Sequence, residues 1–453
     1  MGLKGSQVEI VITELKYGGK AVGAYEDLPV ITNFGIPGQR QLVKIKRMRQ
    51  SYIEATTIEI VEQSPLMTDN PCPHWEDCGG CSLQGMPYQQ QIELKTNQIK
   101  SLFQRNDLEP GNWLPALTSP KIDEYRNKME FSFGNTYKNG PLTLGMHQRG
   151  RRHDVVDTPF CRLVDEDIRK IRSITARFFR DRGILPYHRM THQGILRHLV
   201  VRKAATTGEI LINLVTTHQP DLPVEEWKNQ LLALSLEGSI EGILWTHNDC
   251  VADIVNSDST QCLFGQASIS EQLMNLRFTI TPFSFFQTNS HAAALLFNSI
   301  NEWLTSEDRC VIDLYCGLGT ISQMVAKKAR HVTGVELVEE SVNQARVDSV
   351  YNGVKNVDYI AGDVREILHQ LPHQPDLLIV DPPRAGIHPK VMDQLLTMGV
   401  ERFIYVSCNP VSMIENLKQA ANCGWHIVKA RPIDMFPYTP HVETVVLMSR
   451  VEK

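Results

Sequence analysis

The sequence predicts an α/β protein whose C-terminal part forms a doubly wound, mainly parallel sheet. After Pro282, short apolar runs alternate with helical segments, and the clearest runs are residues 310–315, 331–336, 376–381 and 402–407. A chain of 453 residues is also too long for one hydrophobic core, so two or three domains are expected. In such a sheet, ligands are expected at the carboxyl ends of the strands.

The N-terminal residues predict a small β-barrel. Residues 8–13, 41–46 and 52–61 alternate apolar and polar side chains, and turns are expected at Gly18-Gly19 and at 36–38. Barrels of this size with a basic strand often bind oligonucleotides, and a purely structural barrel is the alternative.

A mixed α+β central region is expected between the barrel and the parallel sheet. A helix is predicted over residues 88–103, and strands are predicted at 199–202 and 209–215. The predicted domains are residues 1–66, 67–282 and 283–453, with helix 88–106 as a segment that can pack on the last of them.

Composition and charge favour a cytoplasmic protein with a polyanionic partner. No apolar run reaches the roughly 20 residues that cross a bilayer, and the N-terminus lacks a secretory signal. We expect a monomer without an obligate protein partner. The net charge of −5 argues against nucleic acid, but basic residues gather in 44–49, 149–152 and 169–203. Any one cluster is equally compatible with a solvated surface, whereas three together favour a polyanion.

The turn that follows the first parallel strand suits an adenosyl ligand. Its sequence, Asp313–Gly319, places glycines where a ligand can approach the backbone, and Ser322 departs from the dinucleotide fingerprint. Glu336, at the end of the next strand, can accept both ribose hydroxyls, and Asp363 is placed to meet the adenine edge. This order resembles class I S-adenosylmethionine-dependent methyltransferases. A nucleotide-binding fold without methyl transfer is the alternative.

A cysteine at a strand end suggests which atom receives the methyl group. The loop Asp381–Gly386 resembles loops of enzymes that methylate exocyclic amines, so it does not choose the target. Uracil C5 is too poor a nucleophile for direct attack, but a thiolate from Cys408 added to C6 would make C5 enolate-like. A base must then remove the C5 proton. The site is also expected to lower the thiol pKa. A buried core cysteine is the alternative.

Five ordered motifs resemble the RNA 5-methyluridine methyltransferase family, and the chain is most similar to the branch that acts on 23S ribosomal RNA. The motifs are residues 285–289, 313–317, 381–386, 407–410 and 435–443. The glycine motifs at 18–23 and 35–39 resemble the TRAM domain, an RNA-binding barrel of the OB type.

The resemblance implies a role for each of seven residues. Cys408 is implied as the nucleophile and Glu443 as the base, and Phe285 is implied to stack on a flipped-out uracil. The implied contacts to S-adenosylmethionine are Gln287, Tyr315, Glu336 and Asp381. The position of Asp363 in the sequence adds it as the expected contact to the adenine. Two departures from the family pattern are the pair Glu415-Asn416, where Arg-Asp is common, and Tyr438, where histidine is common.

Four cysteines offer soft ligands outside this site. Cys72, Cys78, Cys81 and the distant Cys161 suit a zinc ion or an iron–sulfur cluster, and spacing alone does not separate the two. Four unrelated cysteines are the alternative. The resemblance implies a [4Fe-4S] cluster, with a role in folding or RNA binding, because methyl transfer moves no net electrons.

The function expected from these features is methyl transfer from S-adenosylmethionine to C5 of a specific uridine in 23S ribosomal RNA. The nearest alternative is the T-loop uridine of tRNA, which is less favoured because bacterial tRNA enzymes of this family generally lack the barrel and the cysteines. A 5-methylcytidine enzyme and a non-catalytic RNA-binding assembly factor are weaker alternatives.

Overall fold

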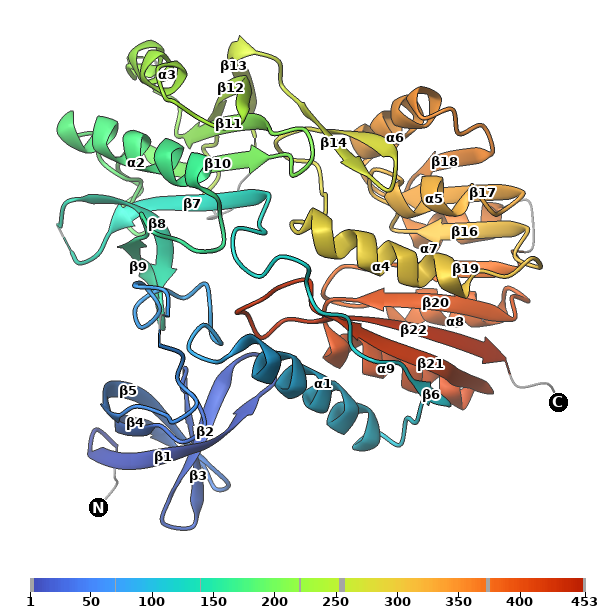
Figure 1. The fold of residues 1–453 in the computed structure, drawn as a ribbon, viewed down its shortest axis with the longest axis horizontal. Coiled ribbons are helices and arrows are strands. Elements are labelled where there is room, and N and C mark those ends of the chain that lie inside the picture. The colour runs from blue at the N-terminus through green and yellow to red at the C-terminus, as the bar shows by residue number, and fades with distance from the viewer. Residues whose placement is uncertain are drawn as a thin grey trace.

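A computed structural model describes residues 4–69, 71–138, 140–219, 221–251, 257–371 and 375–450. It contains a closed barrel, a seven-stranded sheet, a two-stranded sheet and an eight-stranded sheet, in this order along the chain except for one early edge strand of the last sheet (Figure 1). Within these ranges, no helix combines the length and the apolar character needed to cross a bilayer.

The barrel is built from five strands in the order β1-β2-β3-β5-β4. They are β1 (Gln7–Lys16), β2 (Lys20–Tyr25), β3 (Leu28–Thr32), β4 (Arg40–Met48) and β5 (Ile53–Glu62). Alternate residues such as Ile10, Val43 and Ile45 point inward and are buried. The sequence predicted a barrel and three of its strands. Strands β2 and β3 are short and contain Gly23 and Pro29, which weakens their strand signal.

The central sheet has the order β13-β12-β11-β10-β7-β8-β9, and helices α2 and α3 pack on one face (Figure 1). Only β11 and β12 are parallel neighbours among its pairs as described. The elements are β7 (Lys128–Asn135), β8 (Leu142–Gln148), β9 (Arg151–Asp157), α2 (Glu166–Asp181), β10 (Leu196–Lys203), β11 (Glu209–Thr216), α3 (Val224–Leu232), β12 (Ser239–His247) and β13 (Ser259–Gly265).

Most basic residues of segment 169–203 are engaged inside this central fold. Arg172 is buried against Asp157, and Lys203 pairs with Asp165 and with Asp167. The remaining engaged members bind acidic side chains or backbone carbonyls: Arg169, Lys170, Arg180, Arg182, Arg197 and Arg202. The segment therefore does not supply the open basic face that its composition suggested. On the barrel, Lys44 and Lys46 are exposed.

The C-terminal sheet has the order β18-β17-β16-β19-β20-β22-β21-β6. Its first five strands are parallel, and β22 runs antiparallel between β20 and β21. The elements are β6 (Asn112–Trp113), α4 (Ser290–Trp303), β16 (Cys310–Leu314), α5 (Thr320–Val325), β17 (His331–Glu336), α6 (Glu339–Tyr351), β18 (Val357–Ala361), α7 (Val364–Ile367), the 3-10 helix η1 (Leu368–Gln370), β19 (Leu377–Val380), α8 (Pro389–Thr397), β20 (Arg402–Ser407), α9 (Pro410–Asn422), β21 (Trp425–Ile433) and β22 (Glu443–Arg450). The predicted doubly wound sheet is confirmed.

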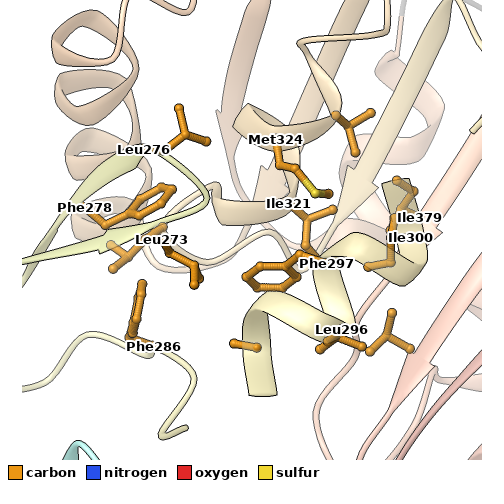
Figure 2. Packing of buried hydrophobic residues seen from close by; sticks show 14 of the residues in the cluster. Leu273, Leu276, Phe278, Phe286, Leu296, Phe297, Ile300, Ile321, Met324 and Ile379 are labelled. Atoms are coloured by element: carbon orange, nitrogen blue, oxygen red, sulfur yellow. The ribbon is translucent and has the colours of Figure 1, made fainter. Parts of the chain in front are cut away.

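The core of this sheet also uses residues from before position 283. Helix α1 (Tyr88–Gln104) buries Ile99 and Phe103 against one face. The hairpin of β14 (Ile269–Leu273) and β15 (Leu276–Ile280) packs on the other side. Figure 2 shows the hairpin residues Leu273, Leu276 and Phe278 around Phe297 of α4 and Met324 of α5.

Candidate active site

The sheet reverses its winding between β16 and β19, so the carboxyl ends of these strands open a crevice where ligands bind in doubly wound folds. Tyr315 follows β16 and Asp381 follows β19. Together with Gln287 they line one small cavity of about 30 Å³ at this edge. Three of the predicted cofactor contacts are therefore neighbours.

Glu336 and Asp363 extend this edge along β17 and β18. The carboxylate of Glu336 accepts hydrogen bonds from the backbone N–H of Gly317, at 3.1 Å, and of Val338, at 3.0 Å. Asp363 caps α7 by accepting from Arg365 N–H at 2.8 Å. Burial, and then the nearby Asp363 carboxylate, raises the pKa of Tyr315 to about 12.

The glycine turn needs an unusual backbone, which explains its sequence. Tyr315, Gly317 and Gly319 all have positive φ values, of 63°, 56° and 71°. Gly319 caps α5, and a Cβ there would lie 2.4 Å from the hydroxyl of Tyr359. Tyr315 has no such freedom, so its left-handed conformation is a strained position, a feature that clusters at functional sites.

The predicted nucleophile and base lie on neighbouring strands. Cys408 follows β20, and Glu443 begins β22, the antiparallel neighbour. Their last paired residues are Ser407 and Thr444, so Cys408 and Glu443 occupy the next position of the ladder. Residues opposite each other in an antiparallel pair have Cα atoms about 5 Å apart. The strand register thus brings together residues that are distant in sequence.

The electrostatics of the pair differ from the sequence-based expectation. We expected a lowered thiol pKa, but burial, followed by the carboxylates of Glu443 and Asp381, raises the pKa of Cys408 to about 11. Burial and Asp381 also raise the pKa of Glu443 well above its usual range. Glu443 is 4% exposed, and among the described groups its Oε2 has no hydrogen-bond donor. Its burial and the nearby Asp381 therefore give this carboxyl a high affinity for a proton.

Two features oppose these effects and favour the thiolate. The guanidinium of Arg384 lowers the pKa of Cys408. Cys408 also directly precedes Asn409, the N-cap of the 13-residue helix α9, whose N-terminus carries partial positive charge. Asn409 Nδ2 and Ser412 Oγ donate to the carbonyl of Arg384 at 2.8 and 3.0 Å. Sequence reasoning missed Arg384, although its motif was recognised.

The loop of residues 284–289 separates the cofactor edge from a second cavity. Phe285 is 67% exposed and lines both cavities, and Gln287 lines the first. Asn127 Nδ2 donates to the carbonyl of Gln287 at 2.9 Å. Buried Arg202 donates to the carbonyls of Pro282 and Ser284. The central sheet therefore fixes the loop that carries two predicted site residues.

Comparisons with known proteins identify the family. A family model described as tRNA (Uracil-5-)-methyltransferase matches residues 87–451. The chain belongs to this family. It is 41% identical over 448 residues to an uncharacterized RNA methyltransferase of Clostridium tetani, with 99% of this chain and 98% of that protein covered. An uncharacterized RNA methyltransferase of Listeria innocua is 32% identical, with 98% of each chain covered.

A solved structure of the same fold supports this assignment. It is the Pyrococcus abyssi tRNA (uracil-54, C5)-methyltransferase in complex with S-adenosyl-L-homocysteine, which is 27% identical, covers 97% of this chain and 99% of its own, and has a TM-score of 0.79. The chain is thus an RNA uracil-C5 methyltransferase that uses S-adenosylmethionine, with an α/β methyltransferase fold and an N-terminal five-stranded barrel.

The four predicted ligand cysteines of the methyltransferase surround one cavity. Cys72, Cys78, Cys81 and Cys161 all line a cavity of about 350 Å³, which Phe285 also borders. Burial raises the pKa of Cys161 to about 11, with smaller contributions from Cys78 and Cys72. No group of three or more His, Cys, Asp or Glu residues in the described ranges is arranged to hold a metal ion.

A half-buried arginine beside these cysteines favours negative charge on them. Arg149 donates to the carbonyls of Trp75, Cys78 and Cys81 at 2.9, 2.8 and 2.6 Å, and it lowers the pKa of the Cys81 thiol against the dominant effect of burial. The four thiols line one cavity and thiolates are the usual ligands of iron–sulfur clusters, but their present arrangement in the described part of the chain does not form a metal site. Arg149 therefore holds the backbone of the segment that carries Cys78 and Cys81.

The methyltransferase accommodates both departures from the family pattern. Asn416 is buried, accepts from Ile387 N–H and Tyr405 O–H at 2.9 Å each, and so ties α9 to the end of the Asp381–Gly386 loop. Tyr438 donates its hydroxyl to Asp123 at 3.1 Å. Glu415 is exposed, near Lys418.

Proposed function

We propose that this methyltransferase modifies C5 of a specific uridine in 23S ribosomal RNA through a covalent adduct between Cys408 and uracil C6. The observation that carries the proposal is the register of β20 and β22, which sets Cys408 beside Glu443 at the edge that also holds Asp381. A nucleophile, a base and a candidate cofactor pocket then meet at one place, as the chemistry requires.

Cys408 begins the reaction. Its thiolate adds to C6 of the uracil, and the electron pair of the C5–C6 double bond becomes available at C5. S-adenosylmethionine would supply an electrophilic methyl group, which C5 accepts as the sulfonium–methyl bond breaks and S-adenosylhomocysteine leaves. Arg384 and the N-terminus of α9 favour the anionic sulfur, and they offset part of the effect of burial. The candidate contacts that hold the methyl donor are Gln287, Tyr315, Glu336, Asp363 and Asp381.

Glu443 completes the reaction. Its carboxylate takes the C5 proton, the electron pair reforms the C5–C6 bond, and the C6–S bond breaks to return the Cys408 thiolate. A raised pKa suits this role, because it makes Glu443 a stronger base than an exposed carboxylate. The exposed ring of Phe285 provides a stacking surface for the extruded base.

The RNA target rests on resemblance and has one competing candidate. Motif order and the four cysteines are similar to those of the 23S ribosomal RNA branch. The T-loop uridine of tRNA is favoured by a different observation, since the Pyrococcus abyssi tRNA enzyme aligns with 97% of this chain, the barrel included. A barrel by itself therefore does not separate the two targets.

The test is methylation of unmodified 23S ribosomal RNA and tRNA transcripts with labelled S-adenosylmethionine, followed by mapping of the product. Label in 5-methyluridine of the ribosomal RNA alone is the expected result, and label in tRNA alone would replace the proposed target. Cys408→Ala should abolish turnover, and Glu443→Gln should accumulate a covalent RNA adduct. Cys423→Ala, at an exposed cysteine, is the matched control.

We further propose that Cys72, Cys78, Cys81 and Cys161 hold a [4Fe-4S] cluster. A zinc ion needs its four sulfur ligands about 2.3 Å from the metal. The ligands of an iron–sulfur cluster lie further apart, around the whole cluster, and the four cysteines line a cavity in this way. The cluster would tie the segment around Cys78 to the central sheet. Anaerobically purified protein should contain about four irons. Cys161→Ala should lose them and exposed Cys262→Ala should not, while zinc without iron would refute the cluster.

A further inference from the structure

The turn between β1 and β2 of the barrel lies against the catalytic part of the chain. Gly19, in this turn, is buried, and a Cβ there would lie 2.7 Å from the side chain of Ser82 and 3.4 Å from Pro440. The carbonyl of Leu15 accepts a hydrogen bond from Gln98 of α1 at 2.6 Å. The hairpin is therefore seated on α1, on the cysteine segment and on the motif that leads to Glu443.

Tyr17, at the tip of this hairpin, reaches the nucleophile itself. Its hydroxyl donates a hydrogen bond to the backbone carbonyl of Cys408 at 3.4 Å, across 391 positions of sequence. Burial, then the charges of Cys408 and Glu443, raises the pKa of Tyr17 to about 12, so the hydroxyl keeps its proton and remains a donor. The interaction links the N-terminal barrel to the end of β20 in the C-terminal sheet.

The position of this contact matters because it fixes the carbonyl side of the peptide that links Cys408 to Asn409, whose N–H donates to Ser407 Oγ at 3.0 Å. Cys408 lies between the end of β20 and the N-cap of α9, and a rotation of its peptide would redirect the sulfur relative to uracil C6. A misplacement of about 1 Å at a reacting atom can slow a reaction by about a hundredfold. Lys16 and Lys20 flank the turn and are exposed, where RNA phosphates can reach them.

We propose that Tyr17 is a positioning residue for the uracil-C5 methyl transfer: the barrel hairpin holds the Cys408 peptide in the orientation from which the sulfur attacks C6. The barrel then contributes to the rate of the bound complex as well as to RNA affinity. The inference rests on the proposed role of Cys408. It assigns to the catalytic sheet a supporting contact from the first 20 residues of the chain.

The test compares two tyrosines of the barrel. Tyr17→Phe removes the hydroxyl at the site, and Tyr52→Phe removes one that donates to Glu54 at 3.3 Å, away from Cys408. Single-turnover methylation at saturating RNA and S-adenosylmethionine should be about threefold to tenfold slower for Tyr17→Phe, the range of one net hydrogen bond. The KM for RNA and the thermal unfolding midpoint should stay within error. Tyr52→Phe should match the wild type.

A second pair of variants tests the seating of the hairpin. Gly18 and Gly19 have φ values of 86° and 79°, so alanine strains both backbones alike, but only at position 19 does the added methyl meet Ser82 and Pro440. Gly19→Ala should reduce the single-turnover rate more than Gly18→Ala does.

Each outcome decides the matter. A Tyr17→Phe variant that turns over like the wild type, or that loses RNA affinity alone, would overturn the positioning role. Equal rates for the Gly18 and Gly19 variants would overturn the seating argument. A fully active Cys408→Ala variant would instead overturn the proposed function, and this inference with it, whatever Tyr17→Phe does.

Discussion

The pKa of Cys408 makes the pH dependence of the methyltransferase a direct test of the site. With a thiol pKa of about 11, roughly one molecule in a thousand carries the thiolate at pH 8. The rate of C6 attack should therefore rise about tenfold per pH unit between pH 7 and 9. Because the anionic form reacts, activity is gained as the pH rises and is lost as it falls.

Arg384→Met should shift this profile to higher pH. Loss of the cation removes an interaction that lowers the thiol pKa. Two unit charges about 4 Å apart in water interact by about 1 kcal/mol, and the exposed guanidinium is screened, so we expect about a fivefold lower rate at any pH below the pKa. Arg384→Lys keeps the charge and should keep the profile.

The assay is single-turnover formation of 5-methyluridine at saturating RNA and S-adenosylmethionine, measured from pH 7 to 9. Saturation separates a change in thiol ionisation from a change in RNA binding. A rate that is flat with pH in the wild type would show that deprotonation of Cys408 does not limit attack. Superimposed profiles for wild type and Arg384→Met would refute the role of the guanidinium.

Two further predictions concern residues that support the site. Arg202→Met should raise the KM for S-adenosylmethionine about tenfold in steady-state kinetics, because the loop beside Gln287 loses its hydrogen bonds. The control is Arg197→Met, which removes a buried donor to other carbonyls of the same central domain and should change this KM little. Lys95→Met should lower the free energy of unfolding by about 3 to 5 kcal/mol, because Asp434, its buried partner at 2.7 Å, is left unpaired. In denaturant unfolding, adding Asp434→Asn should restore most of this loss; additive losses would refute the pairing argument.

The sequence predicted the parts of the fold that depend on local pattern. Continuous apolar runs identified the parallel strands, and the position of Cys408 at a strand end made it the candidate nucleophile, because both signals lie within a few residues. The proximity of Glu443 depends on the antiparallel insertion of β22, which no local pattern encodes; only family resemblance suggested it.

Long-range contacts account for what sequence reasoning missed. The hydroxyl of Tyr17, in the barrel, donates to the backbone carbonyl of Cys408. The side chain of Arg384 interacts with the Cys408 thiol. Charge composition was misleading for the same reason. Segment 169–203 is rich in arginine, but its partners, such as Asp157 and Glu124, come from other segments, so the sequence showed the cations without the groups that bind them.

The antiparallel strand β22 has a consequence for how this chain can vary. The separation of Cys408 and Glu443 is set by one step across a pair of strands, whatever the length of the chain between them. Residues inserted or removed at the exposed turn between α9 and β21, around Gly424, would leave that separation unchanged, because loop length has only a weak effect on stability. A one-residue slip of β22 against β20, by contrast, would turn the base to the opposite face of the sheet.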